Sequence, residues 1–277
     1  MIIDGKALAQ EVIEGLKAER EKMNFPISLA VVAVLKDGAG LSFIRQKEKV
    51  ARELDIKFIS HQYPVTLKSK ELRKRIVDLA KNGQIKGIVV QLPLPENFNQ
   101  PMVLNAIPPE KDPDVLTEKN LGAFYLNRLK ILPPVVRSIK YLIERYQITL
   151  RGQNVLIIGQ GPLVGKPLAL WFINQKATVI SANSRTQNLK ELTLKADIIV
   201  SGAGEPDLIK KEMVKEGVII FDAGLVTEKG TLKSDVSVEV QDKAALVTPV
   251  PGGLGPLVVA MLYRNLFDLI QLGPKGR

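Results

Sequence analysis

Cysteine is absent from this chain of 277 residues, and histidine occurs once, at His61. Without cysteine there can be no disulfide framework, no thiol nucleophile and no zinc knuckle. A single histidine excludes a His-pair metal site, although it could complete a Ser-His-Asp triad, for which the order of Ser, Asp and His gives no support. We therefore assign proton transfer to Lys, Asp, Glu, Tyr or bound water. We expect no metal, and no role is assigned to His61.

Long hydrophobic runs are missing as well. No run of about 18 apolar residues occurs, and the opening MIIDGKALAQEVIEG lacks a basic region that leads into an apolar stretch. These absences predict a cytoplasmic protein without a membrane segment. The formal net charge of +10 suggests a nucleic-acid binder, but aromatic residues make up only 5% of the chain and no helix-turn-helix, RNP or KH pattern occurs. We expect no nucleic-acid partner.

Apolar runs alternate with helix-period stretches along the whole chain, which is typical of an α/β fold with a mostly parallel sheet. The predicted strands are 29–35, 57–60, 87–91, 154–158, 177–181, 197–201, 218–222 and 246–248. Apolar residues recur every four positions between strands, as in the series Leu8, Val12, Leu16 and Leu72, Ile76, Ala80. The length suggests one large or two ordinary domains.

Two crossings between domains are predicted. Pro133 and Pro134 precede a helical stretch over 135–146, which indicates a connecting helix. A second crossing is expected between 248 and 256, because a long amphipathic helix over 260–270 should pack back on the first domain. The predicted domains are a three-layer α/β domain, 1–145 plus 256–277, and a Rossmann-type domain with a parallel sheet, 146–255.

A glycine-rich loop follows the predicted strand 154–158. Its GxGxxxG motif contains Gly159, Gly161 and Gly165, with Gln160 and Val164 between them, and a helical stretch follows. Glycines there allow the backbone to approach a pyrophosphate closely, and the helix N-terminus supplies N–H donors. Since strand, loop, helix and a second strand occur in order, the pattern favours dinucleotide binding over a plain βα turn.

The end of the second strand bears on the choice of dinucleotide. NAD-binding loops usually place an acidic residue there, but this chain has Asn183, Ser184, Arg185 and Thr186. A hydroxyl and a guanidinium suit a 2′-phosphate, so NADP is favoured, with NAD as the alternative. Arg185 could otherwise be a solvated loop residue.

Lys47 is the basic residue predicted to face inward from a helix over 40–54. Phe43, Lys47, Val50, Ala51 and Leu54 share one face of that helix. A lysine beside apolar neighbours loses hydration, which disfavours its ammonium form and makes the amine a usable base near neutral pH. The alternative is a lysine that snorkels past the edge of the core.

Two further polar residues stand out, one at the end of a predicted strand and one in a predicted loop. Gln91 follows the apolar run 87–90 and would lie at the carboxyl end of its strand, where ligands collect in open α/β sheets. Asp114 lies in the proline-flanked segment PPEKDPDV. Taken singly, a strand-end glutamine or a loop aspartate is more often structural.

Four segments match a known pattern, in order and over nearly the whole chain. They are IDGK (3–6), GIVVQLPLP (87–95), PEKDPD (109–114) and TPVPGGLGPLVVAML (248–262). On these segments the sequence resembles the bifunctional methylenetetrahydrofolate dehydrogenase/methenyltetrahydrofolate cyclohydrolase family. Members oxidise methylenetetrahydrofolate by hydride transfer to a nicotinamide and hydrolyse the methenyl product to formyl-tetrahydrofolate, in a site without metal.

The resemblance implies a role for each matching residue. Lys47 matches the catalytic lysine, Gln91 the glutamine that tunes it, and Asp114 the carboxylate that holds the pterin ring. The other implied positions are Phe43, Pro251, Gly252 and Gly253 for substrate, and Gly159, Gln160, Gly161, Val164, Gly165, Ser184, Arg185 and Gly204 for cofactor. The implied partners are tetrahydrofolate substrates and a second copy in a homodimer. Seven basic residues against two acidic ones over 68–86 form a solvated helix face that could attract polyglutamylated folate.

Several positions depart from the family pattern. Phe43 replaces Tyr, Gln160-Gly161 replaces Arg-Ser, Asn183 replaces His and Val258 replaces Thr, while Pro133-Pro134-Val135-Val136 replaces Pro-Cys-Thr-Pro. The folate-loop match also stops after Asp114. Because the changes gather around the cofactor and the proton-transfer residues, two alternatives stay open: a dehydrogenase-only member, and a non-catalytic protein that binds folate or dinucleotide.

Overall fold

The computed structural model describes residues 1–34, 40–224, 226–228 and 231–273. The chain forms two compact units, each named here by its main sheet. The five-stranded unit comprises residues 1–9 and 135–258, and the three-stranded unit comprises residues 10–134 and 259–277. The boundaries at 9/10 and 258/259 fall within helices α1 (Gly5–Arg20) and α9 (Leu254–Leu272).

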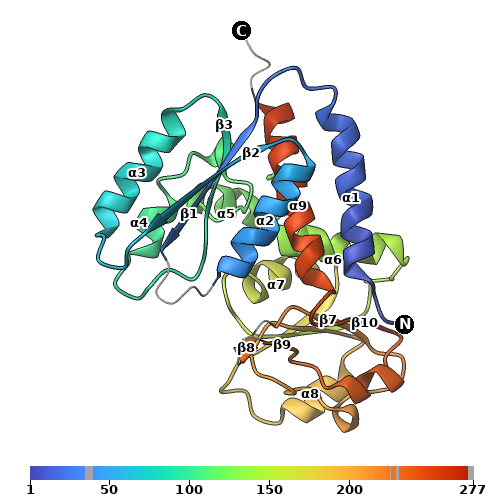
Figure 1. Ribbon diagram of the computed structural model, residues 1–277. Coiled ribbons are helices and arrows are strands. Elements are labelled where there is room, and N and C mark those ends of the chain that lie inside the picture. The colour runs from blue at the N-terminus through green and yellow to red at the C-terminus, as the bar shows by residue number, and fades with distance from the viewer. Residues whose placement is uncertain (35–39, 225, 229–230, 274–277) are drawn as a thin grey trace. The chain divides into compact units, whose positions relative to one another are not determined.

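The three-stranded unit is built on a parallel sheet with the order β2-β1-β3. Its strands are β1 (Ser28–Val34), β2 (Lys57–Tyr63) and β3 (Ile85–Val90). Its helices are α2 (Leu41–Glu53), α3 (Ser69–Lys81), α4 (Gln100–Leu104) and α5 (Glu118–Tyr125), with the larger parts of α1 and α9. Figure 1 shows α3 and α4 against one face of the sheet and α2 and α9 against the other. β1 is the central strand of this sheet. Because helices cover both faces, each of its residues is buried.

Alternate residues of β1 explain the two faces. Ala30, Val32 and Val34 share a buried cluster with Leu72 and Ile76 of α3. The intervening residues point to the opposite face. Burial on both sides explains why this strand is a continuous apolar run in the sequence.

The five-stranded unit contains a parallel sheet with the order β10-β7-β6-β4-β5. Its strands are β4 (Asn154–Ile158), β5 (Thr178–Ala182), β6 (Ile198–Ser201), β7 (Ile219–Asp222) and β10 (Leu246–Thr248). Its helices include α6 (Pro134–Arg145), which begins at the boundary residue, α7 (Gly165–Asn174) and α8 (Leu189–Lys195). Because all five strands run in the same direction, their carboxyl ends and the loops that follow lie at one edge of the sheet.

The predicted α/β fold with parallel sheets in two domains is confirmed, with differences at particular elements. Strand β2 continues to Tyr63, three residues past its predicted end, and α9 begins at Leu254, six residues before its predicted start. An antiparallel pair, β8 (Val226–Glu228) and β9 (Thr231–Lys233), was not predicted, because two strands of three residues carry no readable alternation. No helix in the described part of the chain is long and apolar enough to cross a membrane.

Candidate active site

Lys47 and Gln91 meet at the carboxyl edge of the three-stranded sheet. Lys47 lies in the second turn of α2, which follows β1, and Gln91 directly follows β3. The Lys47 ammonium donates a hydrogen bond of 2.8 Å to Gln91 Oε1. Gln91 is itself fixed, because its backbone N–H donates to Val32 O at 2.8 Å and its side-chain amide donates to Leu92 O at 2.9 Å. The amide oxygen is therefore turned toward the lysine.

Asp114 and Lys47 influence each other electrostatically. Burial, with a smaller effect of the Asp112 charge in the same direction, raises the pKa of the Asp114 carboxyl to about 6 against the opposing effect of Lys47. Burial also lowers the pKa of Lys47, while the Asp114 charge opposes that change. Both shifts bring the pKa values of the two groups closer to neutral pH. The uncharged amine and the uncharged carboxyl therefore form more readily here than on an exposed surface.

The loop that carries Asp114 is organised by Asp112, which sequence reasoning did not single out. Asp112 is fully buried, and its carboxylate accepts hydrogen bonds from the backbone N–H groups of Leu116 and Thr117, at 2.9–3.1 Å. The Thr117 hydroxyl and the Asn120 amide donate to the same carboxylate, at 2.8 and 3.0 Å. These bonds close the loop around the buried residue at position 115.

Val115 occupies that position in a left-handed conformation, with φ of 59°. A β-branched residue rarely adopts this conformation, because its Cβ approaches the following carbonyl. Strain of this kind persists only where the surroundings over-determine it. The five hydrogen bonds to Asp112 supply that constraint. The match to the family's folate-loop pattern ends before Val115. The loop is nevertheless closed by the hydrogen bonds to Asp112.

Phe43 and Tyr263 flank the lysine on α2. Phe43 lies one turn before Lys47 and is half-buried, while Arg45 and Lys49 on other faces are exposed, as the helical periodicity predicts. Tyr263 is fully buried in α9, and its hydroxyl donates to Lys47 O at 2.6 Å. Burial raises the pKa of the Tyr263 phenol, so it stays protonated and remains a donor. Sequence reasoning missed Tyr263, because it falls among apolar residues of α9.

The glycine loop of the five-stranded unit has the close backbone approaches that a dinucleotide loop requires. A Cβ on Gly165 would lie 1.8 Å from Gly159 O, and a Cβ on Gly159, whose φ is +100°, would lie 2.4 Å from Gly202 O. The loop leads into α7 at Gly165, where the helix N-terminus offers N–H donors. Gly161 has open space around it. These residues fit a pyrophosphate group.

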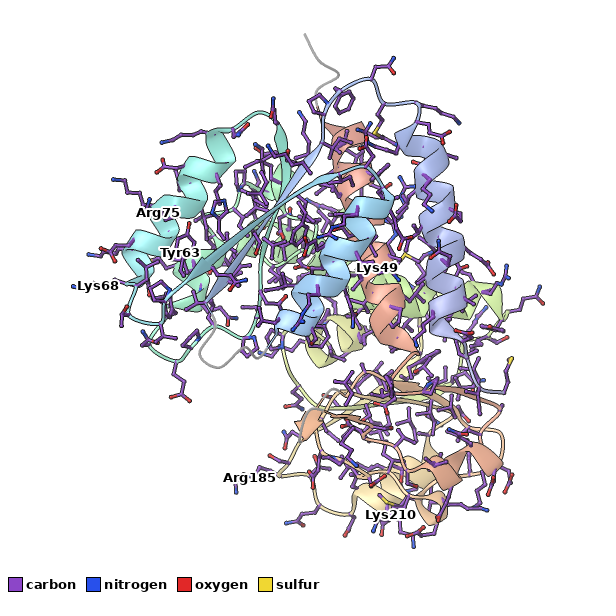
Figure 2. The ribbon with its side chains drawn as sticks, in the orientation of Figure 1. Lys49, Tyr63, Lys68, Arg75, Arg185 and Lys210 are labelled. Atoms are coloured by element: carbon purple, nitrogen blue, oxygen red, sulfur yellow. The ribbon has the colours of Figure 1, made fainter. Side chains whose placement is uncertain are left out.

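Gln160 and Asn183, two positions that depart from the family pattern, bind each other. Asn183 Nδ2 donates to Gln160 Oε1 at 3.0 Å, and Gln160 Nε2 donates to Ser181 Oγ at 3.0 Å. The pair thus joins the glycine loop to the end of β5. Ser184 and Arg185 follow it and are exposed. Figure 2 shows Arg185 at the periphery of this unit, so its side chain is accessible to a ligand.

The remaining predicted positions also lie in the five-stranded unit. Pro251, Gly252 and Gly253 follow β10; the Val250–Pro251 peptide is cis, and Gly253 N–H donates to Pro249 O at 2.7 Å. The Gly204 N–H donates to the buried Asp235 carboxylate at 3.2 Å. The structure therefore brings Lys47, Gln91 and Asp114 together in one unit. The glycine loop, the β5 end and the segment 251–253 are in the other unit.

Among the residues that the structure describes, no group of three or more His, Asp or Glu side chains could hold a metal ion. A parallel sheet with a pyrophosphate-binding glycine loop, together with a second α/β unit that contains a lysine bonded to glutamine, defines a two-domain NAD(P)-binding enzyme.

Family models agree with this class. The chain matches the tetrahydrofolate dehydrogenase/cyclohydrolase catalytic domain over residues 3–114 and the NAD(P)-binding domain of the same family over residues 133–272. The chain belongs to the tetrahydrofolate dehydrogenase/cyclohydrolase family. It is therefore an enzyme of one-carbon folate metabolism, as the resemblance in the sequence predicted.

Relatives resemble the chain along its whole length. The bifunctional protein FolD 2 of Lactobacillus johnsonii is 40% identical over 274 residues, which are 98% of this chain and 97% of that protein. The crystal structure of the bifunctional enzyme FolD from Campylobacter jejuni has a TM-score of 0.92 at 33% identity and covers 98% of this chain and 99% of its own. FolD of Trypanosoma brucei, complexed with NADP cofactor and inhibitor, has a TM-score of 0.94 at 28% identity and covers 100% of this chain and 99% of its own.

Proposed function

We propose that the chain oxidises methylenetetrahydrofolate to methenyltetrahydrofolate with NADP and hydrolyses the methenyl product to 10-formyltetrahydrofolate. The observation that carries this proposal is the hydrogen bond of 2.8 Å between the Lys47 amine and Gln91, beside the Asp114 carboxyl. Hydrolysis needs a group that accepts a proton from water and returns it. Lys47, with its lowered pKa, is suited to both tasks.

In the hydrolytic step, water adds to the methenyl carbon and gives up a proton to the neutral Lys47 amine. The bond from that carbon to one ring nitrogen then breaks while the added hydroxyl releases its proton to solvent and becomes the formyl C=O. The nitrogen takes the electron pair of the broken bond and the proton held by Lys47, so one proton is released overall. Gln91 orients the amine through its fixed amide oxygen. We assign Asp114 to the pterin ring, Phe43 to stacking on the folate, and Pro251, Gly252 and Gly253 to substrate contact. The assignments of these five residues rest on the match to the family pattern.

We assign the cofactor to the five-stranded unit. Gly159, Gly161 and Gly165, with Val164, would hold the pyrophosphate on backbone donors at the start of α7. Ser184 and Arg185 would bind a 2′-phosphate, which favours NADP over NAD, and Gln160 and Gly204 would border the site. The bound nicotinamide supplies the hydride acceptor. The NADP complex of the trypanosomal relative supports this choice of cofactor.

A coupled assay tests the proposal. Reduced cofactor and methenyl absorbance are followed together, with NAD and NADP in parallel, for the wild type, Lys47→Ala and the control Lys49→Ala. Lys49 lies on the same helix with its side chain exposed (Figure 2). Loss of a general base should reduce methenyl hydrolysis by about 10²–10⁴-fold in Lys47→Ala and leave Lys49→Ala unchanged.

The outcomes separate the alternatives. Full methenyl hydrolysis by Lys47→Ala would contradict the catalytic assignment. A wild type that reduces NADP while the methenyl product accumulates would be a dehydrogenase-only enzyme. Binding of one ligand in calorimetry, without turnover on either cofactor, would indicate a non-catalytic protein.

We also propose that the preferred substrates are polyglutamylated. A depression of about 300 Å³ on the three-stranded unit is lined by Lys70, Arg73 and Met102. Lys70 and Arg73 lie in the first turns of α3, which follows β2 and so begins at the same sheet edge as Gln91. Two cations there suit the carboxylates of a glutamate tail. The Michaelis constant should fall with tail length, and Lys70→Ala with Arg73→Ala should remove this dependence. Arg75→Ala should not, because Arg75, which is on the same helix (Figure 2), does not line the depression.

Three further features remain proposals, of which the homodimer rests on the family pattern and the other two rest on the sequence. We propose a homodimer in the cytoplasm, with a folate-binding domain of residues 1–145 plus 256–277 and a dinucleotide-binding domain of residues 146–255. Sedimentation equilibrium measures the first of these. A mass of one chain at micromolar concentration would contradict the dimer.

A further inference from the structure

Asp235 is a fully buried carboxylate that the proposed reaction does not use. It follows β9 and accepts four hydrogen bonds from the carboxyl end of β6 and the loop after it. The donors are Ser201 Oγ (2.7 Å), Ala203 N (2.9 Å), Gly204 N (3.2 Å) and Glu205 N (2.9 Å). Three successive backbone N–H groups form a concave set of donors of the kind that binds anions. In this protein the Asp235 carboxylate occupies that anion position.

The position of Asp235 is fixed from its other sides. Its backbone O accepts from Ile209 N at 2.9 Å. Its carboxyl group lies against Gly224, where a Cβ would be 2.0 Å from Asp235 Cγ. Gly224 in turn donates its N–H to Asp222 Oδ1 at 2.9 Å, at the end of β7. A carboxylate held in this way places the residues 202–205 in one conformation.

The loop 202–205 forms one wall of the glycine loop. Gly202 N–H donates to Ile158 O at 2.8 Å, so the chain leaves β6 directly beside the end of β4. Gly202 O occupies the space where a Cβ of Gly159 would lie, at 2.4 Å. On the other side, a Cβ on Gly202 would lie 2.8 Å from Val164 Cγ1. A shift of this loop would therefore displace the glycine loop as well.

We propose that Asp235 is a positioning residue for the dinucleotide site. It fixes the loop 202–205, and this loop fixes the glycine loop that receives the pyrophosphate. The N–H groups of Ala203, Gly204 and Glu205 donate to Asp235. The loop therefore influences the cofactor by packing against the glycine loop, and these N–H groups do not bind the cofactor themselves. The inference rests on dinucleotide binding by this unit and is independent of the cyclohydrolase step.

Calorimetry with NADP tests the proposal on the full chain. Asp235→Asn replaces one acceptor oxygen by a donor, so at least one backbone N–H loses its partner. The dissociation constant for NADP should rise at least about tenfold in Asp235→Asn and about threefold in Ser201→Ala, which removes a single donor. Asp242→Asn is the matched control, because Asp242 is an exposed carboxylate of the same unit, paired with Lys211 at 2.6 Å. It should bind NADP like the wild type.

A second measurement on the same samples separates positioning from general stability. Methenyl hydrolysis uses Lys47 and Gln91 in the other unit, so its turnover number should stay within about twofold in all variants. An unchanged affinity for NADP in Asp235→Asn would overturn the proposal, as would a proportional loss of NADP binding and hydrolysis. If Asp235→Asn does not fold, an unchanged affinity in Ser201→Ala overturns it. A wild type that binds NADP without turning over folates contradicts the proposed function, while the affinities still decide this inference.

Discussion

At the scale of single residues, the site combines positions that follow the family pattern with positions that do not. Lys47 and Gln91 keep their mutual hydrogen bond. Phe43, one helical turn away, presents a ring without a hydroxyl, so in the proposed mechanism proton transfer depends on the lysine and the amide without a phenol at position 43.

Restoring the phenol tests this dependence. Phe43→Tyr adds one hydroxyl to a half-buried ring, where it can stay in contact with water. We expect unchanged folate binding and no reduction in turnover, measured as the Michaelis constant and turnover number for both reactions. A large loss of turnover would show that the pocket has been rebuilt around the missing hydroxyl.

The pair Gln160–Asn183 bears on cofactor choice. Gln160→Arg would place a cation beside the β5 end, where a 2′-phosphate would bind, and a charged hydrogen bond contributes about 1.5–3 kcal/mol. The ratio of kcat/KM for NADP to that for NAD should therefore rise by about 10–100-fold. Gln160→Leu removes the amide without adding charge, and it serves as the control. An equal rise in the control would mean that the amide pair obstructs the phosphate.

At the scale of elements, the loop 112–117 shows how a strained residue is held beside a candidate substrate-binding residue. Val115 has a φ of 59° and lies next to Asp114. In this conformation alanine is less favourable than glycine by about 1 kcal/mol. Val115→Gly should thus have a larger free energy of unfolding than Val115→Ala, by about that amount, in urea titrations.

The same pair of substitutions in a regular helix is the matched control. Lys119 is exposed in α5, where alanine should be more stable than glycine by about 1 kcal/mol. The order of the two variants should therefore reverse between the two positions. If Val115→Ala has a larger free energy of unfolding than Val115→Gly, the left-handed conformation does not persist in solution.

The parts of the structure that the sequence predicts are those with periodic signals. The period of α2 turns Lys47 inward and Arg45 outward, and the apolar runs locate eight strands of the two parallel sheets. Asp112 and Asp235 carry no such signal, because a loop carboxylate that collects backbone N–H groups looks the same in sequence as a solvated one. The contact between Gln160 and Asn183 joins residues 23 positions apart through strand pairing, and only the fold reveals it.

At the scale of the whole molecule, buried carboxyls make stability depend on pH. Burial, together with a smaller effect of the Asp235 charge, raises the pKa of Asp222 to about 7. The folded chain then keeps a proton that the unfolded chain has lost, so this contribution is fully present below pH 3.8 and declines as the pH rises toward about 7. Asp114 contributes in the same direction, up to its pKa of about 6.

Asp222→Asn removes this titration and keeps an amide oxygen as acceptor for Gly224 N–H. The free energy of unfolding should fall less steeply between pH 4 and 7 in this variant than in the wild type, with a difference of at most on the order of 4 kcal/mol. Urea titrations at a series of pH values measure it. Parallel curves for the two proteins would contradict the raised pKa of Asp222.

The order of segments along the chain also has a consequence for biosynthesis. The three-stranded unit is interrupted after residue 134 and resumes at residue 259, so the part of α9 from residue 259 onward is made after the whole five-stranded unit. Until then Asn265 cannot donate to Pro113 O and Leu132 O, and Leu266 cannot cover Gly87. At about 5–20 residues per second, the ribosome needs roughly 6–25 s to cross that interval. During translation the site around Lys47 therefore stays incomplete, with one face of its sheet only partly covered, until residues 259–272 of α9 have been made.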